Sequence, residues 1–121
     1  MNKNRSLKKN EMFLKVYKRG SRVHQKYFVL HYLPNGGSCN RLGIKVSKKI
    51  AAAVGRNRLK RLVRECCRLF EPELKTGYDL VVVAKEGSPS VSGLVEVQRC
   101  LGYLFMRAGL YADSGNKSGR V

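Results

Sequence analysis

A run of basic and polar residues between positions 48 and 68 is the part of the sequence best suited to chemistry. Its members are Lys48, Lys49, Arg56, Asn57, Arg58, Lys60, Arg61, Arg64 and Arg68. An arginine can hold a phosphate through two hydrogen bonds and can also stack on a base. Like charges at helical spacing destabilise an isolated helix, and Glu65 is the one acid among them. Binding to the phosphates of a nucleic acid would explain this run, which we call the basic run. Asn57 could contact the nucleic acid or cap the helix.

The charge of the whole chain is concentrated around the basic run. The 121 residues include 25 basic and 8 acidic side chains, which gives a formal net charge of +17. Residues 1–68 hold 19 of the basic and 2 of the acidic side chains, so the entire excess lies upstream of residue 69. A charged helix face is often only a solvated surface, but the shortage of interleaved acids favours a face that binds a polyanion. The pattern does not distinguish RNA from DNA.

Aromatic residues near the start of the chain form a second candidate site. Phe13 and Tyr17 share one face of an expected helix, and a strand rich in aromatics follows it. Such rings beside a basic sheet face can stack the bases of an unpaired strand. Spacing alone, however, favours the alternative that these rings belong to the hydrophobic core. A lone histidine such as His31 is likewise more often structural than catalytic.

Other kinds of site find little support in the sequence. The four cysteines show no C-x-x-C spacing and only two histidines are present, so we expect no zinc site. We find no paired carboxylates, no nucleophile–base pair and no glycine loop for phosphates, and therefore expect no active site made by this chain alone. No apolar stretch reaches the length of a membrane-spanning helix. We expect a cytoplasmic protein with reduced thiols, monomeric on its own.

A small α+β domain would position these residues. The expected order is helix, strand, strand, helix, strand, helix, over residues 10–19, 27–33, 41–47, 57–70, 78–84 and 93–108. The short turn at 34–37 predicts that the first two strands form an antiparallel pair. The unbroken apolar run at 78–84 predicts a strand covered on both faces. We expect one domain over residues 1–111, flexible at 1–6, and a disordered tail over residues 112–121.

The basic run closely resembles the signature of the bacterial ribonuclease P protein subunit. That family has S-K-K followed by A-V-x-R-N-R-x-K-R-x-x-R-E, and this chain has S-K-K at 47–49 and A-V-G-R-N-R-L-K-R-L-V-R-E at 53–65. The similarity extends to L-K-K-N-E at 7–11, F-V-L at 28–30, R-L-G-I at 41–44 and Y-D-L-V-V-V-A at 78–84. It therefore covers about residues 5 to 110.

The resemblance implies a central sheet with a left-handed crossover, similar to a domain of a small-subunit ribosomal protein. It also implies removal of the 5′ leader from precursor transfer RNA, catalysed by an RNA subunit that uses Mg²⁺, with no cofactor bound by the protein alone. The basic run would contact that RNA. A cleft between the first helix and the sheet would bind the leader through Phe13, Tyr17, Val29, His31 and Lys45.

Two positions depart from the family pattern, and three other functions compete with the one it implies. His31 stands where an aromatic residue is expected in the cleft, and Ala51-Ala52 stands where Gly-Asn is common. The competing interpretations are a ribosomal or nucleoid protein, a nuclease that acts alone, and a basic helix on a membrane surface.

Overall fold

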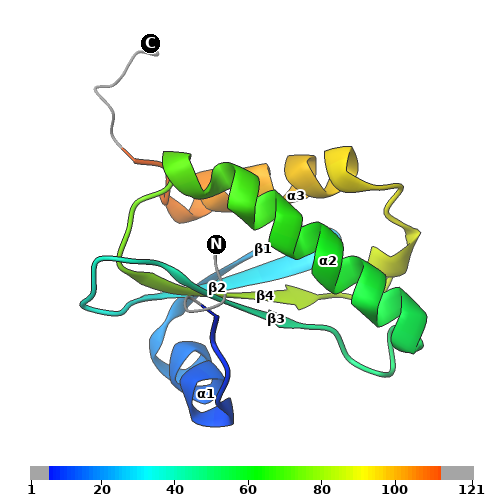
Figure 1. The fold of residues 1–121 in the computed structure, drawn as a ribbon, viewed down its shortest axis with the longest axis horizontal. Coiled ribbons are helices and arrows are strands. Elements are labelled where there is room, and N and C mark those ends of the chain that lie inside the picture. Colours follow the sequence, from blue (N-terminus) through cyan, green and yellow to red (C-terminus); the bar gives the residue numbers. More distant parts are fainter. Residues whose placement is uncertain (1–5, 113–121) are drawn as a thin grey trace.

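The computed structural model describes residues 6–112 as a four-stranded sheet between helices on its two faces (Figure 1). The helices are α1 (Asn10–Arg19), α2 (Ala53–Phe70) and α3 (Leu94–Ala108), and the strands are β1 (Ser21–His24), β2 (Phe28–Pro34), β3 (Arg41–Lys45) and β4 (Tyr78–Ala84). Two 3₁₀ turns, η2 (Glu71–Glu73) and η3 (Ser88–Ser90), flank β4. Helices α2 and α3 cover one face of the sheet, and α1 covers the other. The predicted α+β class is confirmed.

Strand β4 lies inside the sheet, whose order is β1-β2-β4-β3. It runs antiparallel to β2 and parallel to β3. Alternate side chains of its apolar run enter the two cores, because Leu80 and Val82 pack under α2 and α3 while Val81 packs under α1. The prediction that residues 78–84 are covered on both faces is therefore confirmed.

The expected antiparallel pair of β2 and β3 is wrong, because β4 lies between these strands. Residues 35–40 connect them, and six residues readily span the roughly 10 Å between strands that are two positions apart. The parallel strands β3 and β4 are joined through α2, which is the crossover connection expected from the family. The expected order also omits β1, a four-residue edge strand whose only partly buried residue is Val23.

Helix α2 begins four residues earlier than expected. Ala52 precedes its first residue and provides no side-chain cap, so Asn57 lies in the second turn and does not cap the helix. The four additional residues, 53–56, contain no conspicuous start signal, so the sequence pattern alone did not identify this first turn. The backbone N–H groups of the first turn are consequently left without a side-chain partner.

The predicted flexible start and disordered tail lie mostly outside the described residues. Residues 1–5 and 113–121 are not described. Ser6 forms a parallel bridge with Leu42, at the outer edge of β3, and the N–H of Ala112 donates a 2.8 Å hydrogen bond to the carbonyl of Glu73. The domain as described therefore extends to both ends of the 6–112 range.

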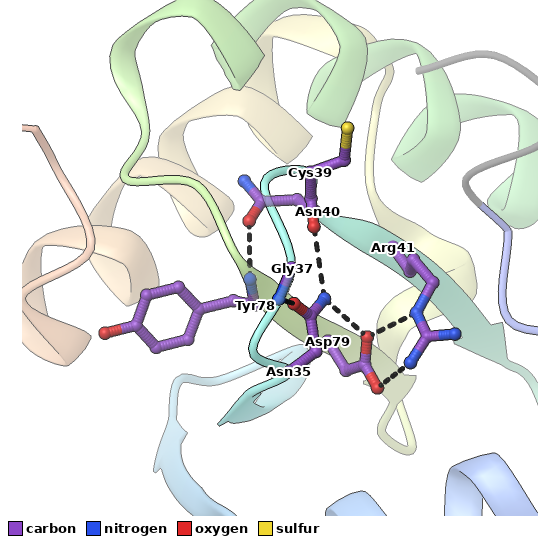
Figure 2. Close-up of polar contacts among 7 residues, drawn as sticks. All are labelled: Asn35, Gly37, Cys39, Asn40, Arg41, Tyr78 and Asp79. Carbon is purple, nitrogen blue, oxygen red and sulfur yellow. Dashed lines mark hydrogen bonds and ion pairs between the residues drawn. The ribbon is translucent and has the colours of Figure 1, made fainter.

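A polar network attaches the loop at 35–40 to the start of β4 (Figure 2). The carboxylate of Asp79, which is 4% exposed, accepts hydrogen bonds from Arg41 Nε at 2.7 Å, Arg41 Nη2 at 2.8 Å and Asn35 Nδ2 at 3.0 Å. Asn40, also buried, accepts the N–H of Tyr78 at 2.8 Å. A buried carboxylate is tolerated here because both of its oxygens have donors. The hydrogen bond to Asp79 also raises the pKa of Arg41.

We expect Asp79→Ala to lower the free energy of unfolding by about 2–3 kcal/mol, because it leaves Arg41 and Asn35 without their shared acceptor. Urea unfolding followed by circular dichroism would measure the change. Glu86→Ala provides the control, since Glu86 is exposed and should change stability by no more than about 0.5 kcal/mol. Equal stability of the two variants would show that the network contributes nothing.

Candidate nucleic-acid interface

The exposed side of α2 carries one row of polar and basic residues, which we call the α2 ridge. Its members follow helical spacing and are all exposed: Asn57, Arg61, Arg64 and Arg68. The opposite side of the helix is buried in the main core through Leu59, Val63, Cys66 and Cys67. Packing of this apolar side orients the ridge toward solvent. The apolar side of the helix is therefore occupied by the core and is not available to a membrane surface.

Two arginines of the α2 ridge are available to a ligand. Within residues 6–112, the side chains of Arg61 and Arg64 make no hydrogen bond or ion pair. Arg68 instead shares its guanidinium with Glu65, at 3.1 Å from Nε to Oε1, and this contact lowers the pKa of the Glu65 carboxyl. Both partners are exposed, so the pair adds little stability and can open when a phosphate approaches.

The remaining residues of the basic run surround the first turns of α2. Arg56 Nη1 donates to the carbonyl of Ala51 at 3.0 Å, and Arg58 Nη2 donates to the carbonyl of Val91 at 2.8 Å. Arg58 therefore joins α2 to the segment that precedes α3. Lys60 is half-buried, whereas Lys48 and Lys49 are exposed just before the uncapped start of the helix. Uncapped N–H groups next to two lysines form a suitable environment for a phosphate.

The other face of the sheet carries a second site, beside α1. Direct strand pairing places Lys45, Val83 and Val29 in one row across β3, β4 and β2. The Lys45 ammonium lies 4.2 Å from the centre of the Phe13 ring, and the rings of Tyr17 and His31 meet edge to face at 4.8 Å. The structure thus brings together the five residues predicted for the leader, and for this surface we keep the name that the resemblance suggested, the α1 cleft.

The two aromatic residues of α1 differ in accessibility. Phe13 is 6% exposed and belongs to the small core under α1, which confirms the core alternative for this residue. Gly43 permits the packing, because a Cβ there would lie 2.4 Å from Phe13 Cε1. Tyr17 is 36% exposed and keeps part of its ring accessible, while partial burial raises its pKa. Tyr17 is therefore the ring on which a base could stack. Phe13 instead packs in the core behind Lys45.

His31, at the position where the resemblance led us to expect an aromatic residue, packs its ring edge to face against Tyr17. Its pKa is lowered by burial first, and then by the charges of Arg22 and His24. The sequence analysis did not identify Arg22 and His24 as neighbours of His31, because it did not predict strand β1. Arg22 pairs with His31 and His24 pairs with Val29, so both point to the α1 face of the sheet.

The lowered pKa of His31 predicts a pH-dependent stability. As the pH falls, the unfolded chain protonates His31 near pH 6.5, whereas the folded protein protonates it only at a lower pH. The contribution of neutral His31 to the stability of the fold is therefore present above pH 6.5 and is lost as the pH falls toward the folded pKa. We expect His31→Gln to remove this contribution. The difference in free energy of unfolding between the two proteins should change as the pH falls from about 7 to about 5. A difference that is constant with pH would contradict the prediction.

The α2 ridge and the α1 cleft lie on opposite faces of one sheet (Figure 1). A ligand on one face would leave the other accessible. None of the helices formed by residues 6–112 has the length and apolar character required to cross a membrane. The geometry is that of a small basic domain with two separate surfaces, one carrying the arginines of the α2 ridge and the other carrying aromatic rings beside Lys45.

Comparisons with known proteins agree on one family. A family model described as "Ribonuclease P" matches residues 1–109. The ribonuclease P protein component of Clostridium kluyveri is 43% identical over 107 residues, which cover 87% of this chain and 95% of that protein. The corresponding protein of Brevibacillus brevis is 38% identical over 121 residues, which cover 99% of this chain and 95% of that protein.

Solved structures agree with the sequence relatives. The RNase P protein of Staphylococcus aureus superposes with a TM-score of 0.82 at 30% identity, over 89% of this chain and 98% of that one. The RNase P protein of Thermotoga maritima superposes with a TM-score of 0.77 at 33% identity, over 84% of this chain and 96% of that one. The fold and the sequence therefore indicate the same family.

Proposed function

The chain belongs to the ribonuclease P protein family, the protein components of the enzyme that removes the 5′ leader of precursor transfer RNA, and we propose how its two faces divide that work. The α2 ridge and the start of α2 bind the RNA subunit. The α1 cleft binds the leader. The observation that carries this proposal is the position of the two surfaces on opposite faces of one sheet, which allows both RNAs to be bound together.

The surface for the RNA subunit consists of the whole basic run. Arg61 and Arg64 provide guanidinium groups that have no partner among residues 6–112, and Arg68 joins them when its pair with Glu65 opens. Lys48, Lys49 and the uncapped N–H groups at the start of α2 provide a phosphate site at the other end of the helix. With about eight phosphates engaged, affinity should fall by about 10³–10⁵ between low and moderate salt.

The surface for the leader is a strip of sheet with one aromatic wall. Val29 and Val83 form an apolar floor, Tyr17 with His31 forms the wall, and Lys45 provides a cation at one end. An unpaired strand can stack a base on Tyr17 and place a phosphate near Lys45. This combination suits a single-stranded leader whatever its sequence, because every base has a face that stacks.

In this proposal the protein assists catalysis and the RNA subunit performs it. Two polyanions repel each other, and a chain with a net charge of +17 offsets that repulsion while it holds the leader in place. Mg²⁺ ions at the RNA active site would supply the activated water. Within residues 6–112, no group of three His, Cys, Asp and Glu side chains lies close enough to hold a metal ion. We place the protein in the cytoplasm, monomeric until it meets the RNA.

Single-turnover cleavage tests the proposal. Precursor transfer RNA is mixed with the ribonuclease P RNA encoded by the same genome at low Mg²⁺, with and without the protein. We expect the protein to increase the rate of leader removal, because it replaces part of the cation requirement. No gain would refute the proposal and would favour another kind of RNA-binding protein. Cleavage by the protein without RNA would refute the assignment of catalysis to the RNA subunit.

A further inference from the structure

We infer that the leader continues beyond the α1 cleft, over the turn between β1 and β2, and inserts one unpaired nucleotide into a pocket against α3. This inference rests on the proposed function. The pocket has a volume of about 480 Å³ and is lined by His24, Gln25, Lys26 and Tyr27 from the turn and by Glu96, Arg99, Cys100 and Tyr103 from α3. This volume is within the range of about 300–1,000 Å³ that is usual for small-ligand sites. We call it the turn pocket.

His24 connects the turn pocket with the α1 cleft. Strand pairing extends the row Lys45–Val83–Val29 by one further residue, which is His24 on β1. Four adjacent strands span roughly 14 Å, which an unpaired strand covers in about three nucleotides. The neighbouring pair, Arg22 beside His31, adds a cation along the same path. A strand that starts at Lys45 and follows the floor therefore arrives at His24 on the edge strand β1. From there it passes around this edge to the α3 side of the sheet, where the pocket lies.

The residues of the turn pocket suit a nucleotide. Tyr103 is 42% exposed and Tyr27 is half-buried, so each ring can offer a surface to a base. Lys26 and Arg99 are exposed cations at the pocket, and Lys26 Nζ lies 5.2 Å from the centre of the Tyr27 ring. Two cations, Lys26 and Arg99, accompany the one acid, Glu96. This balance favours an anionic ligand that has an aromatic part.

The acid in the turn pocket limits how the nucleotide can enter. Glu96 would repel a phosphate, so the phosphate must stay near Lys26 and Arg99 at the rim. Glu96 Oε1 already accepts the N–H of Ser92 at 2.7 Å, which fixes the carboxylate. Its remaining acceptor capacity can receive a hydrogen bond from a base amino group. The base therefore enters the pocket and the phosphate remains outside.

The wall formed by the turn is held rigidly before any ligand arrives. Gln25 Oε1 accepts the N–H of Tyr27 at 2.8 Å and that of Phe28 at 3.2 Å. Lys85 Nζ donates to the carbonyl of Gln25 at 2.8 Å, and the N–H of Lys85 donates to the carbonyl of Tyr27 at 2.8 Å. A preformed wall lowers the entropic cost of ordering the site on binding.

The test uses the assembled holoenzyme and precursors that differ only in leader length. We measure Kd for leaders of about two and about ten nucleotides, because only the longer one can cross the four strands. Tyr103→Ala should weaken binding of the long leader by about five- to fiftyfold and leave the short leader within about twofold. Arg99→Gln should give a smaller loss with the same length dependence. Lys75→Gln is the control, since it removes one exposed charge at the opposite end of β4 and should change neither Kd.

An abasic scan along the long leader locates the nucleotide. One abasic position should weaken binding by the wild-type holoenzyme and have no further effect in Tyr103→Ala. Equal losses for both leader lengths would overturn the inference, because the pocket would then contact the RNA subunit or the transfer RNA body. If Tyr103→Ala left the Kd for the long leader unchanged, the inference would be overturned too. The proposed function would still stand if the wild-type holoenzyme bound the long leader more tightly than the short one. A wild-type holoenzyme with no preference for a leader would overturn both.

Discussion

Replacing Arg61 and Arg64 together by alanine should weaken binding of the ribonuclease P RNA by about ten- to hundredfold at moderate salt. Both guanidinium groups are exposed, and neither has a protein partner within residues 6–112. Each lost phosphate contact should also lower the slope of log affinity against log salt by about one, so the pair should lower it by about two. Filter binding or fluorescence anisotropy at several salt concentrations would measure both quantities.

A second double variant separates position from net charge. Lys75→Ala with Lys15→Ala removes two exposed positive charges outside α2 and should leave the RNA affinity within about threefold. All four positions are exposed, so the stability of both double variants should stay within about 1 kcal/mol of the wild type. Equal losses of affinity would show that overall charge, and not the α2 ridge, binds the RNA. Arg58→Ala is a poorer probe, because it also removes the hydrogen bond to Val91.

Replacing Phe13 by alanine should lower the free energy of unfolding by about 3–4 kcal/mol. The ring is 6% exposed, fills the space above Gly43, and supports the Lys45 ammonium at 4.2 Å from its centre. The empty space left behind cannot be closed by Gly43, which has no side chain. Urea unfolding would measure the loss, and a destabilised variant should also bind precursor transfer RNA poorly.

The matched variants lie on the same helix. Leu14→Ala removes an exposed residue and should cost less than about 1 kcal/mol. Tyr17 is 36% exposed, so Tyr17→Ala should cost little stability while lowering affinity for precursor transfer RNA by about fivefold or more. If Phe13→Ala were as stable as Leu14→Ala, the small core under α1 would not hold this helix in place.

The sequence predicted the elements whose burial follows a local pattern. The apolar stripe of α2 and the unbroken run of β4 identify these elements, because helical period and two-sided burial are visible in consecutive residues. Strand β1 has one partly buried residue in four, so it carries almost no such signal. The pairing of β2 with β4 was missed for another reason: which strand occupies the middle of a sheet depends on contacts between segments far apart in the sequence.

The two proposed binding surfaces, the α2 ridge and the α1 cleft, could be predicted from the sequence to different degrees. The direction of Arg61 and Arg64 follows directly from helical spacing once Leu59 and Val63 are buried. The difference between Phe13 and Tyr17 could not be found in this way, because both lie on the same face of α1. It depends on Gly43 and Lys45, which come from a strand about 30 residues later. Arg22, His24 and the turn pocket were missed because they depend on β1 and on packing against α3.

The most direct test of the two-surface account is the ratio of holoenzyme affinities for precursor and mature transfer RNA, measured with the RNA subunit saturated by protein. Wild-type protein should favour the precursor. Tyr17→Ala should reduce the ratio while its Kd for the RNA subunit stays unchanged. Arg61→Ala with Arg64→Ala should weaken that Kd and, once saturation is reached, leave the ratio as in the wild type. A ratio that falls equally in both variants would contradict the assignment of the two RNAs to opposite faces of the sheet.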